Sequence, residues 1–298
     1  MAARKILGAL ATVVTAASLL VLAPGPLGSP ASAAVDPNLG PVAPPGETFC
    51  YAAADDGDRL AFIRMIGAPG DPGFSIQVDR MRLGIGRANV EALAIRPSGG
   101  IYAVDDASGS TPFGRIIPGE FDPTIDGNAT TNPTARGDFS LIANLTRGGS
   151  GLDLDVDGLT FIETNNLVST DDILLGSVRR SGNDTLVTIA PGTGETSAEW
   201  SIAPPPELTT VPDDDGITNI VDNDIDDIGW DPESDIVYAV LGGSGLNYLG
   251  RLVWVLDDGA GGEIDSTTVP RSVGGTPDFS DLLRLDFVRL GDAAVLDV

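Results

Sequence analysis

A repeat that recurs four times constrains the fold of this chain more than any other feature of its sequence. In each copy an acidic residue opens a short apolar run, a turn follows, and a second apolar run comes next. The four acidic residues are Glu91, Asp157, Asp226 and Asp281, and the copy at Asp281 matches the others least closely. Their spacings of 66, 69 and 55 residues indicate similar supersecondary units that pack against one another.

Each repeat contains about four short runs with strand-like alternation. In the first repeat the runs cover 91–95, 101–104, 114–117 and 139–145, and in the third they cover 237–241, 251–256 and 263–269. Glycine and proline, 38 and 22 residues in all, separate the runs, which is typical of antiparallel strands joined by turns. Trp230 and Trp254 lie in predicted strands of the third repeat, so we expect them in the core.

Four-stranded units arranged around an axis form the blades of a β-propeller. We therefore predict an all-β fold, a β-propeller of four to five four-stranded blades. The N-terminal runs at 48–54, 59–65 and 74–81 would complete the blade that begins at Asp281, so that N- and C-terminal strands close the ring. Six or seven blades, or a β-sandwich, are the alternatives.

Three segments carry a resemblance to a known family. The segments "VEALAIRPSGGIYAVDD", "DVDGLTF" with "NDTLVTIAPGTG", and "DIDDIGWDPESDIVYAV" resemble the repeats of secreted bacterial β-propeller proteins. The resemblance covers about residues 46 to 298. It implies the propeller fold and says almost nothing about activity, because propellers host many functions.

Residues 1–33 have the features of a secretory signal peptide. Arg4 and Lys5 form its positive start, residues 6–23 are apolar, and Ala31-Ser32-Ala33 is a small-residue cleavage site. An uncleaved membrane anchor is the alternative, because the apolar stretch is long. A Pro/Gly-rich linker at 34–45 would lead into the propeller domain at 46–298. Lys5 is the only lysine, and this arginine-only composition favours a bacterial protein, which we expect to be extracellular and monomeric.

The charge balance narrows the classes of partner and of chemistry. The chain has 43 acidic and 17 basic residues, no histidine, and a formal net charge of −26. Nucleic acids and anionic membranes need a basic surface, so we do not expect either as a partner. Without histidine, Ser-His-Asp and Cys-His nucleophiles and imidazole zinc sites are excluded. Carboxylate pairs and hard cations bound by oxygen ligands remain, and no catalytic motif stands out.

The four repeated acids are the first candidate metal site. If Glu91, Asp157, Asp226 and Asp281 open the innermost strands, their carboxylates meet at one mouth of the channel and repel one another. A bound Ca²⁺ would relieve the repulsion, and Arg96 or Arg284 could do the same. The alternative is that these acids mark turns where strands begin.

The second candidate is an acidic loop at 211–222. It resembles the calcium loops of thrombospondin type 3 and dockerin domains, and on that register Asp213, Asp215, Asn219 and Asp222 match ligand positions, with Gly216 at the turn. Val211 stands where the first ligand would be, so one oxygen donor is missing. The alternative is a solvated acidic loop between blades.

These observations predict a secreted, calcium-stabilised β-propeller that acts as a binding or scaffold module. Its ligand would be an extracellular protein or glycan, bound at the acidic mouth of the channel. The alternative function is a metal-dependent hydrolase or lyase that uses the channel carboxylates.

Overall fold

The structure is a computed structural model of the chain, which divides into two parts, Met1–Ala34 and Val35–Val298. All described residues belong to the second part. They are 47–54, 59–67, 70–84, 90–96, 100–105, 109–118, 136–152, 155–163, 172–180, 183–203, 225–241 and 248–292. The predicted signal peptide and the linker at 34–45 lie outside them.

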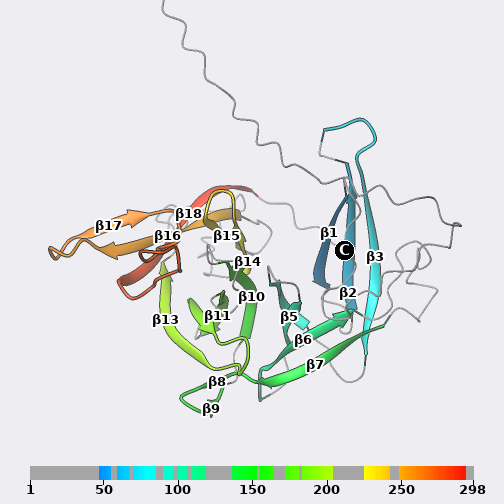
Figure 1. Cartoon of the computed structure of the whole chain (residues 1–298), viewed down its shortest axis with the longest axis horizontal. Coiled ribbons are helices and arrows are strands. Elements are labelled where there is room, and N and C mark those ends of the chain that lie inside the picture. Colours follow the sequence, from blue (N-terminus) through cyan, green and yellow to red (C-terminus); the bar gives the residue numbers. More distant parts are fainter. Residues whose placement is uncertain are drawn as a thin grey trace, which may run out of the picture. The chain divides into compact units, whose positions relative to one another are not determined.

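The described residues form eighteen strands and no helix, which confirms the all-β prediction. Twelve strands make three four-stranded antiparallel meanders (Figure 1). Meander 1 consists of β4 (Val90–Ile95), β5 (Ile101–Asp105), β6 (Pro112–Pro118) and β7 (Arg136–Asn144). Meander 2 consists of β10 (Asp155–Ile162), β11 (Ile173–Arg180), β12 (Asn183–Ile189) and β13 (Thr196–Ala203). Meander 3 consists of β14 (Ile225–Asp231), β15 (Ile236–Leu241), β16 (Tyr248–Asp257) and β18 (Leu282–Asp292).

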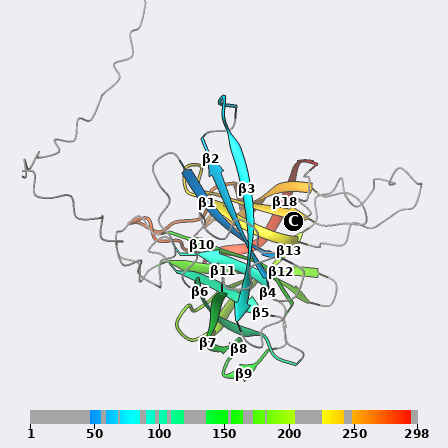
Figure 2. The same ribbon diagram turned by 90° about the vertical axis from the view of Figure 1, so that its right-hand side faces the viewer.

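The remaining strands extend or link the meanders. β1 (Glu47–Ala54), β2 (Arg59–Ile66) and β3 (Ser75–Gly84) lie side by side in both views (Figures 1 and 2). β8 (Thr146–Arg147) and β9 (Ser150–Gly151) form a small hairpin, and β17 (Glu263–Ser266) pairs with β16 in a hairpin that extends outward (Figure 1).

The three meanders are equivalent in their strand register. In each one the first strand has a β-bulge at the same place, at Glu91 in β4, Asp157 in β10 and Asp226 in β14. Meanders 1 and 3 also share a cross-strand arrangement: Ala103 pairs with Gly114, and Ala239 pairs with Gly250. Repeated bulges are specific features of a backbone rather than accidents, so the repeat seen in the sequence is a repeat of structure.

Two sheets contain the three meanders and the N-terminal strands β1 to β3. In one, the parallel pairing of β3 with β7 joins the N-terminal strands to meander 1. In the other, a short parallel pairing of β13 with β18 joins meanders 2 and 3. The strands at the two ends of this second path, β10 and β14, pack against each other, so the sheet nearly closes on itself.

The hydrophobic core lies between successive meanders. One cluster contains Tyr102 and Phe113 of meander 1 with Phe161 and Leu174 of meander 2. A second contains Leu175, Leu186 and Trp200 of meander 2 with Trp254 and other residues of meander 3. Neighbours along β11, such as Leu174 and Leu175, thus face opposite clusters, as the period of two in a strand requires. Both faces of meander 2 are therefore buried.

The predicted pairing of N- and C-terminal strands is wrong for the described strands. β18, which follows Asp281, is the fourth strand of meander 3 and pairs with β16 and β13. β1 to β3 pair with one another and with β7. The fourth sequence repeat is thus not the start of a unit. Its resemblance to the others comes from an acidic residue that precedes an alternating strand, a pattern common to many strands.

Other predictions agree with the described strands. Trp254 is fully buried, and Trp230 packs against the same cluster from a half-buried position, so both belong to the core as expected. No helix in the described part is long and apolar enough to cross a membrane.

Candidate functional site

The three bulges bring acidic side chains to the same end of the three first strands. Glu91 and Asp157 are half-buried, and Asp226 is exposed. A bulge places an extra residue in the strand and redirects its side chain, which is why bulges recur beside functional sites. β4 packs against β10 and β10 against β14, so the three acids occupy equivalent positions on first strands that are in contact. We call them the bulge acids (Glu91, Asp157 and Asp226).

A glycine sets the distance between the strands that carry the second and third bulge acids. A Cβ atom at Gly158 would lie 2.6 Å from the backbone N of Ile228 and 2.9 Å from the Cα of Asp227. Only a residue without a side chain allows β14 to approach β10 this closely. The result is a strand crossing directly beside Asp157 and Asp226.

Asp227 has an altered acidity at this crossing. The residue is exposed, yet the surrounding protein desolvates its carboxyl group, and this raises its pKa to about 7, against the hydrogen bond from Ile228 and with a contribution from the charge of Asp226. A carboxyl group that still holds its proton near neutral pH can donate a hydrogen bond as well as accept one.

Binding of Ca²⁺ by the repeated acids stays a prediction. Among the described residues, no group of three or more acidic side chains lies close enough together to hold a metal ion. Asp281 lies in the turn before β18, away from the first strands, and its backbone carbonyl accepts a hydrogen bond from the N–H of Asp257. The described structure therefore places three of the four predicted acids in equivalent positions and the fourth elsewhere.

The second calcium prediction concerns residues outside the described part. Asp213, Asp215, Asn219 and Asp222 lie between β13 and β14, in a segment that the structure does not describe. Calcium binding by this loop stays a prediction.

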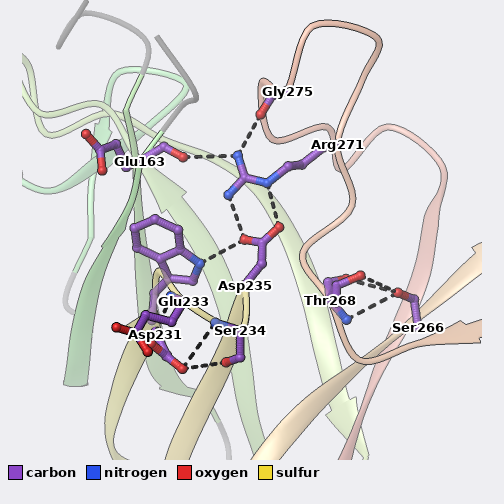
Figure 3. A network of polar contacts seen from close by, with 10 residues as sticks. Glu163, Asp231, Glu233, Ser234, Asp235, Ser266, Thr268, Arg271 and Gly275 are labelled. Atoms are coloured by element: carbon purple, nitrogen blue, oxygen red, sulfur yellow. Dashed lines mark hydrogen bonds and ion pairs between the residues drawn. The ribbon is translucent and has the colours of Figure 1, made fainter. Parts of the chain in front are cut away.

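An arginine cluster marks the opposite end of β14 (Figure 3). Arg271 donates from Nε to Oδ2 of Asp235 at 2.7 Å and from Nη2 to Oδ1 at 2.6 Å, a bidentate pair. Its Nη1 donates to the carbonyl oxygens of Glu163 and Gly275, and its guanidinium group lies 5.8 Å from the ring centre of Trp230. The Trp230 indole N–H also donates to Asp235.

The backbone of Asp235 shows why this cluster needs an aspartate. Asp235 is the only described non-glycine residue with a positive φ, 57°, a conformation that glycine or asparagine usually adopts in turns. Hydrogen bonds from Arg271, and a weaker one from Trp230, lower the pKa of Asp235 despite the opposing effect of burial. The carboxylate thus stabilises a turn that the backbone alone disfavours.

Meander 2 carries a similar cluster at the same position. Arg96 donates to Asp172 at 2.9 Å, and its guanidinium group lies 5.8 Å from the ring centre of Phe161. Phe161 and Trp230 are equivalent residues of β10 and β14, and Asp172 and Asp235 each directly precede the second strand of their meander. In both meanders, an arginine therefore covers the aromatic ring and pairs with the aspartate before the second strand.

These clusters hold the fold together rather than form a catalytic centre. Each arginine is committed to an aspartate and to an aromatic face, and neither points at the bulge acids. The expectation that Arg96 or Arg284 neutralises the repeated acids is not met by their observed contacts: Arg96 pairs with Asp172, and Arg284 lies near Glu263 and Asp286.

Two of the three residues in each cluster, the aromatic residue and the aspartate, can be recognised in the sequence. The equivalent aromatic residues are visible in "DGLTF" and "DDIGW", and an aspartate before the second strand is visible in both repeats. Their arginine partners come from unrelated places, Arg96 from the end of β4 and Arg271 from the segment between β17 and β18, so their pairing was not predicted.

Replacement of Arg271 by lysine tests the cluster. Lysine keeps the charge but cannot form the bidentate pair, so we expect Arg271→Lys to lower the free energy of unfolding by about 1–2 kcal/mol at neutral pH. Because the pKa of Asp235 is lowered in the folded protein, its contribution is present above the pKa of the unfolded chain and is lost as the pH falls through the folded-state value. The difference between variant and wild type, measured by urea denaturation, should shrink in acid. A constant difference at all pH values would contradict this role.

Comparisons with known proteins add little. No protein-family model matches the chain, and no curated protein matches it. A crystal structure of a candidate 6-phosphogluconolactonase from Bacteroides uniformis aligns with a TM-score of 0.27 and 13% identity, covering 81% of this chain and 58% of that chain. The chain thus spans less than two thirds of that protein. A structural similarity this low indicates neither a shared fold nor a shared activity.

Proposed function

We propose that the protein is a secreted bacterial β-propeller that acts as a binding module, with the bulge acids as its ligand-binding face. The meanders would be its blades, and their first strands would line the axis. The ligand would be a cationic group on an extracellular protein or glycan. The observation that carries this proposal is the recurrence of an acidic residue at the same bulge in three consecutive first strands.

The packing supports the blade interpretation. Propeller blades are four-stranded antiparallel sheets that pack face to face through hydrophobic side chains. Here both faces of meander 2 are buried against its neighbours, and the first strands of successive meanders are in contact.

Electrostatics supports a cationic ligand. The chain carries a formal charge of −26, and acidic groups on a protein surface attract counter-charged ligands and speed their association. The bulge acids differ from the other acidic residues because they recur at the same register position in three first strands.

Titration with an octa-arginine peptide, followed by calorimetry, tests the proposal. We expect binding with a dissociation constant of about 10 µM or tighter at about 20 mM salt, and clear weakening at about 200 mM salt as the charges are screened. An octa-glutamate peptide is the control and should not bind. Equal heats from both peptides, or none from either, would contradict the proposal.

A further inference from the structure

The β16–β17 hairpin has a sheet edge that no described strand covers. β17 pairs with β16 on one side, where Asp257 lies opposite Glu263 and Trp254 lies opposite Ser266. No other described strand pairs with β17, and the hairpin extends outward from the meanders (Figure 1). The edge of a strand presents backbone N–H and C=O groups at the spacing that an added strand needs. The outer side of β17 is therefore a place where a further strand can pair.

One face of the hairpin continues a row of apolar residues across three strands. Leu282 of β18 lies opposite Leu256 of β16, which lies opposite Ile264 of β17. Burial decreases along this row: Leu282 is buried, Leu256 is half-buried, and Ile264 is 54% exposed. Leu256 packs against the core between meanders 2 and 3. An apolar side chain on a strand added beyond β17 would lie next to Ile264 and cover it.

The other face of β17 is acidic. Glu263 and Asp265 flank Ile264 in the chain, so they lie on the opposite face of the strand, and both are exposed. Nη2 of Arg284 lies 3.7 Å from Oε2 of Glu263, an exposed pair that contributes little. Asp265 has no ion pair among the described residues. Basic side chains on an added strand would lie directly opposite these two acids.

The turn of the hairpin holds this edge in place without a partner. Oδ1 of Asp258 accepts hydrogen bonds from the N–H groups of Ala260 at 2.7 Å and Gly262 at 2.8 Å. Oδ1 of Asp257 accepts a further hydrogen bond from the N–H of Gly259 at 2.7 Å. A preformed edge loses less conformational entropy on binding than a flexible loop does.

The acidic face argues against a second copy of this chain as the added strand. If two β17 strands paired antiparallel about Ile264, Glu263 of one copy would lie opposite Asp265 of the other. Parallel pairing in register would bring each acid next to its own counterpart. Like charges opposite each other destabilise a strand pair, and each copy carries a formal charge of −26. The same acids favour a partner strand with basic residues.

We propose that the outer edge of β17 is a second binding site, at which an extended segment of another protein adds a strand to the sheet. The segment alternates basic and apolar residues, with the basic ones opposite Glu263 and Asp265 and an apolar one next to Ile264. Main-chain hydrogen bonds to β17 supply affinity, and the alternation supplies specificity. None of the bulge acids takes part, so this site does not rest on the proposed ligand-binding face.

Calorimetry with a short, acetylated and amidated peptide of alternating lysine and valine residues tests the proposal. At about 150 mM salt, which weakens attraction between exposed charges, we expect a dissociation constant of about 100 µM or tighter. The same peptide methylated at every backbone nitrogen keeps its charges but cannot donate main-chain hydrogen bonds, so it should bind at least about tenfold more weakly. Binding of the unmethylated peptide should slow hydrogen exchange of the outward-facing β17 amides and leave that of the β5 amides unchanged.

Two double variants with the same change in charge locate the site. Glu263→Gln/Asp265→Asn removes both acids of β17 and should weaken binding of the alternating peptide about tenfold. Asp71→Asn/Glu233→Gln removes two exposed acids elsewhere and should bind the peptide as the wild type does. Ile264→Thr keeps a β-branched side chain but loses the apolar contact, so it should weaken binding about threefold.

Three outcomes would overturn the proposal. They are no binding of the alternating peptide by the wild type, equal affinities for the methylated and unmethylated peptides, and equal losses in the two double variants. The first two need no variant to fold. Neutralising the bulge acids by Glu91→Gln/Asp157→Asn/Asp226→Asn should leave binding of the alternating peptide unchanged, so failure of this site and failure of the proposed function are distinguishable.

Discussion

Gly250→Ala should lower the free energy of unfolding by about 3 kcal/mol or more. A Cβ atom at this position would overlap the ring of Phe287, which is 2% exposed and belongs to the core between meanders 2 and 3. The ring cannot remain where it is, and expelling or straining a buried aromatic side chain costs several kcal/mol. Urea denaturation of the variant measures this loss.

Gly229→Ala is the matched control for this substitution. Gly229 also lies within a strand, but nothing lies within 4 Å of the position that its Cβ would occupy, so little change is expected. The double variant Gly250→Ala/Phe287→Ala should lose less stability than the sum of the two single variants, because removal of the ring removes the overlap. Strict additivity would show that Phe287 does not cover Gly250.

The equivalent glycine of meander 1 should behave in the same way. A Cβ atom at Gly114 would lie 2.6 Å from the ring of Phe139 and 2.5 Å from the carbonyl oxygen of Ser140. In β7, Phe139 pairs with Ile116 as Phe287 pairs with Leu252 in β18. The two glycine–phenylalanine pairs are therefore the same structural feature in two meanders, and aromatic rings that cover strand glycines are a known stabilising device.

Trp254→Ala should lower the free energy of unfolding by about 3–5 kcal/mol. Trp254 is completely buried, and its ring stacks on Phe279 with 5.2 Å between centroids. Phe279 in turn meets Trp200 of meander 2 edge to face at 5.3 Å, so the substitution opens a cavity in the contact between two meanders. Thermal unfolding, with denaturant titration to obtain the free energy, is the measurement.

Trp254→Phe separates packing from hydrogen bonding at this position, and Val273→Ala serves as a control at the surface. No described residue accepts a hydrogen bond from its indole N–H, so Trp254→Phe should retain most of the stability, since only volume is lost. Val273→Ala, at a fully exposed position, should change the free energy of unfolding by less than about 0.5 kcal/mol. A Trp254→Phe variant as unstable as Trp254→Ala would contradict the packing account.

Most of the strands could be predicted from the sequence because short-range patterns specify them. The runs predicted at 91–95, 101–104, 237–241 and 251–256 lie within β4, β5, β15 and β16. Alternating apolar residues between glycine and proline turns leave few other solutions. The acidic residue before each of the first three runs also marked a real structural position, the β-bulge.

Pairing between distant strands could not be predicted in this way. The residues near Asp281 have the local pattern of a first strand, yet β18 is a fourth strand because β16 and β13 offer it hydrogen-bonding edges. A similar limit applies to the candidate site. In "DVDGLTF", Gly158 resembles an ordinary turn residue. Its role is to allow the close approach of β14, which lies about 70 residues further along the chain.

The most direct test of the proposed binding face compares two triple variants with the same change in charge. The first, Glu91→Gln/Asp157→Asn/Asp226→Asn, neutralises the bulge acids. The second, Asp257→Asn/Glu263→Gln/Asp265→Asn, neutralises three exposed acids on the β16–β17 hairpin. If the bulge acids form the ligand-binding face, the first variant should bind octa-arginine at least about tenfold more weakly than the wild type, while the second retains nearly full affinity. Equal losses in the two variants would show that binding follows net charge alone and would contradict the account.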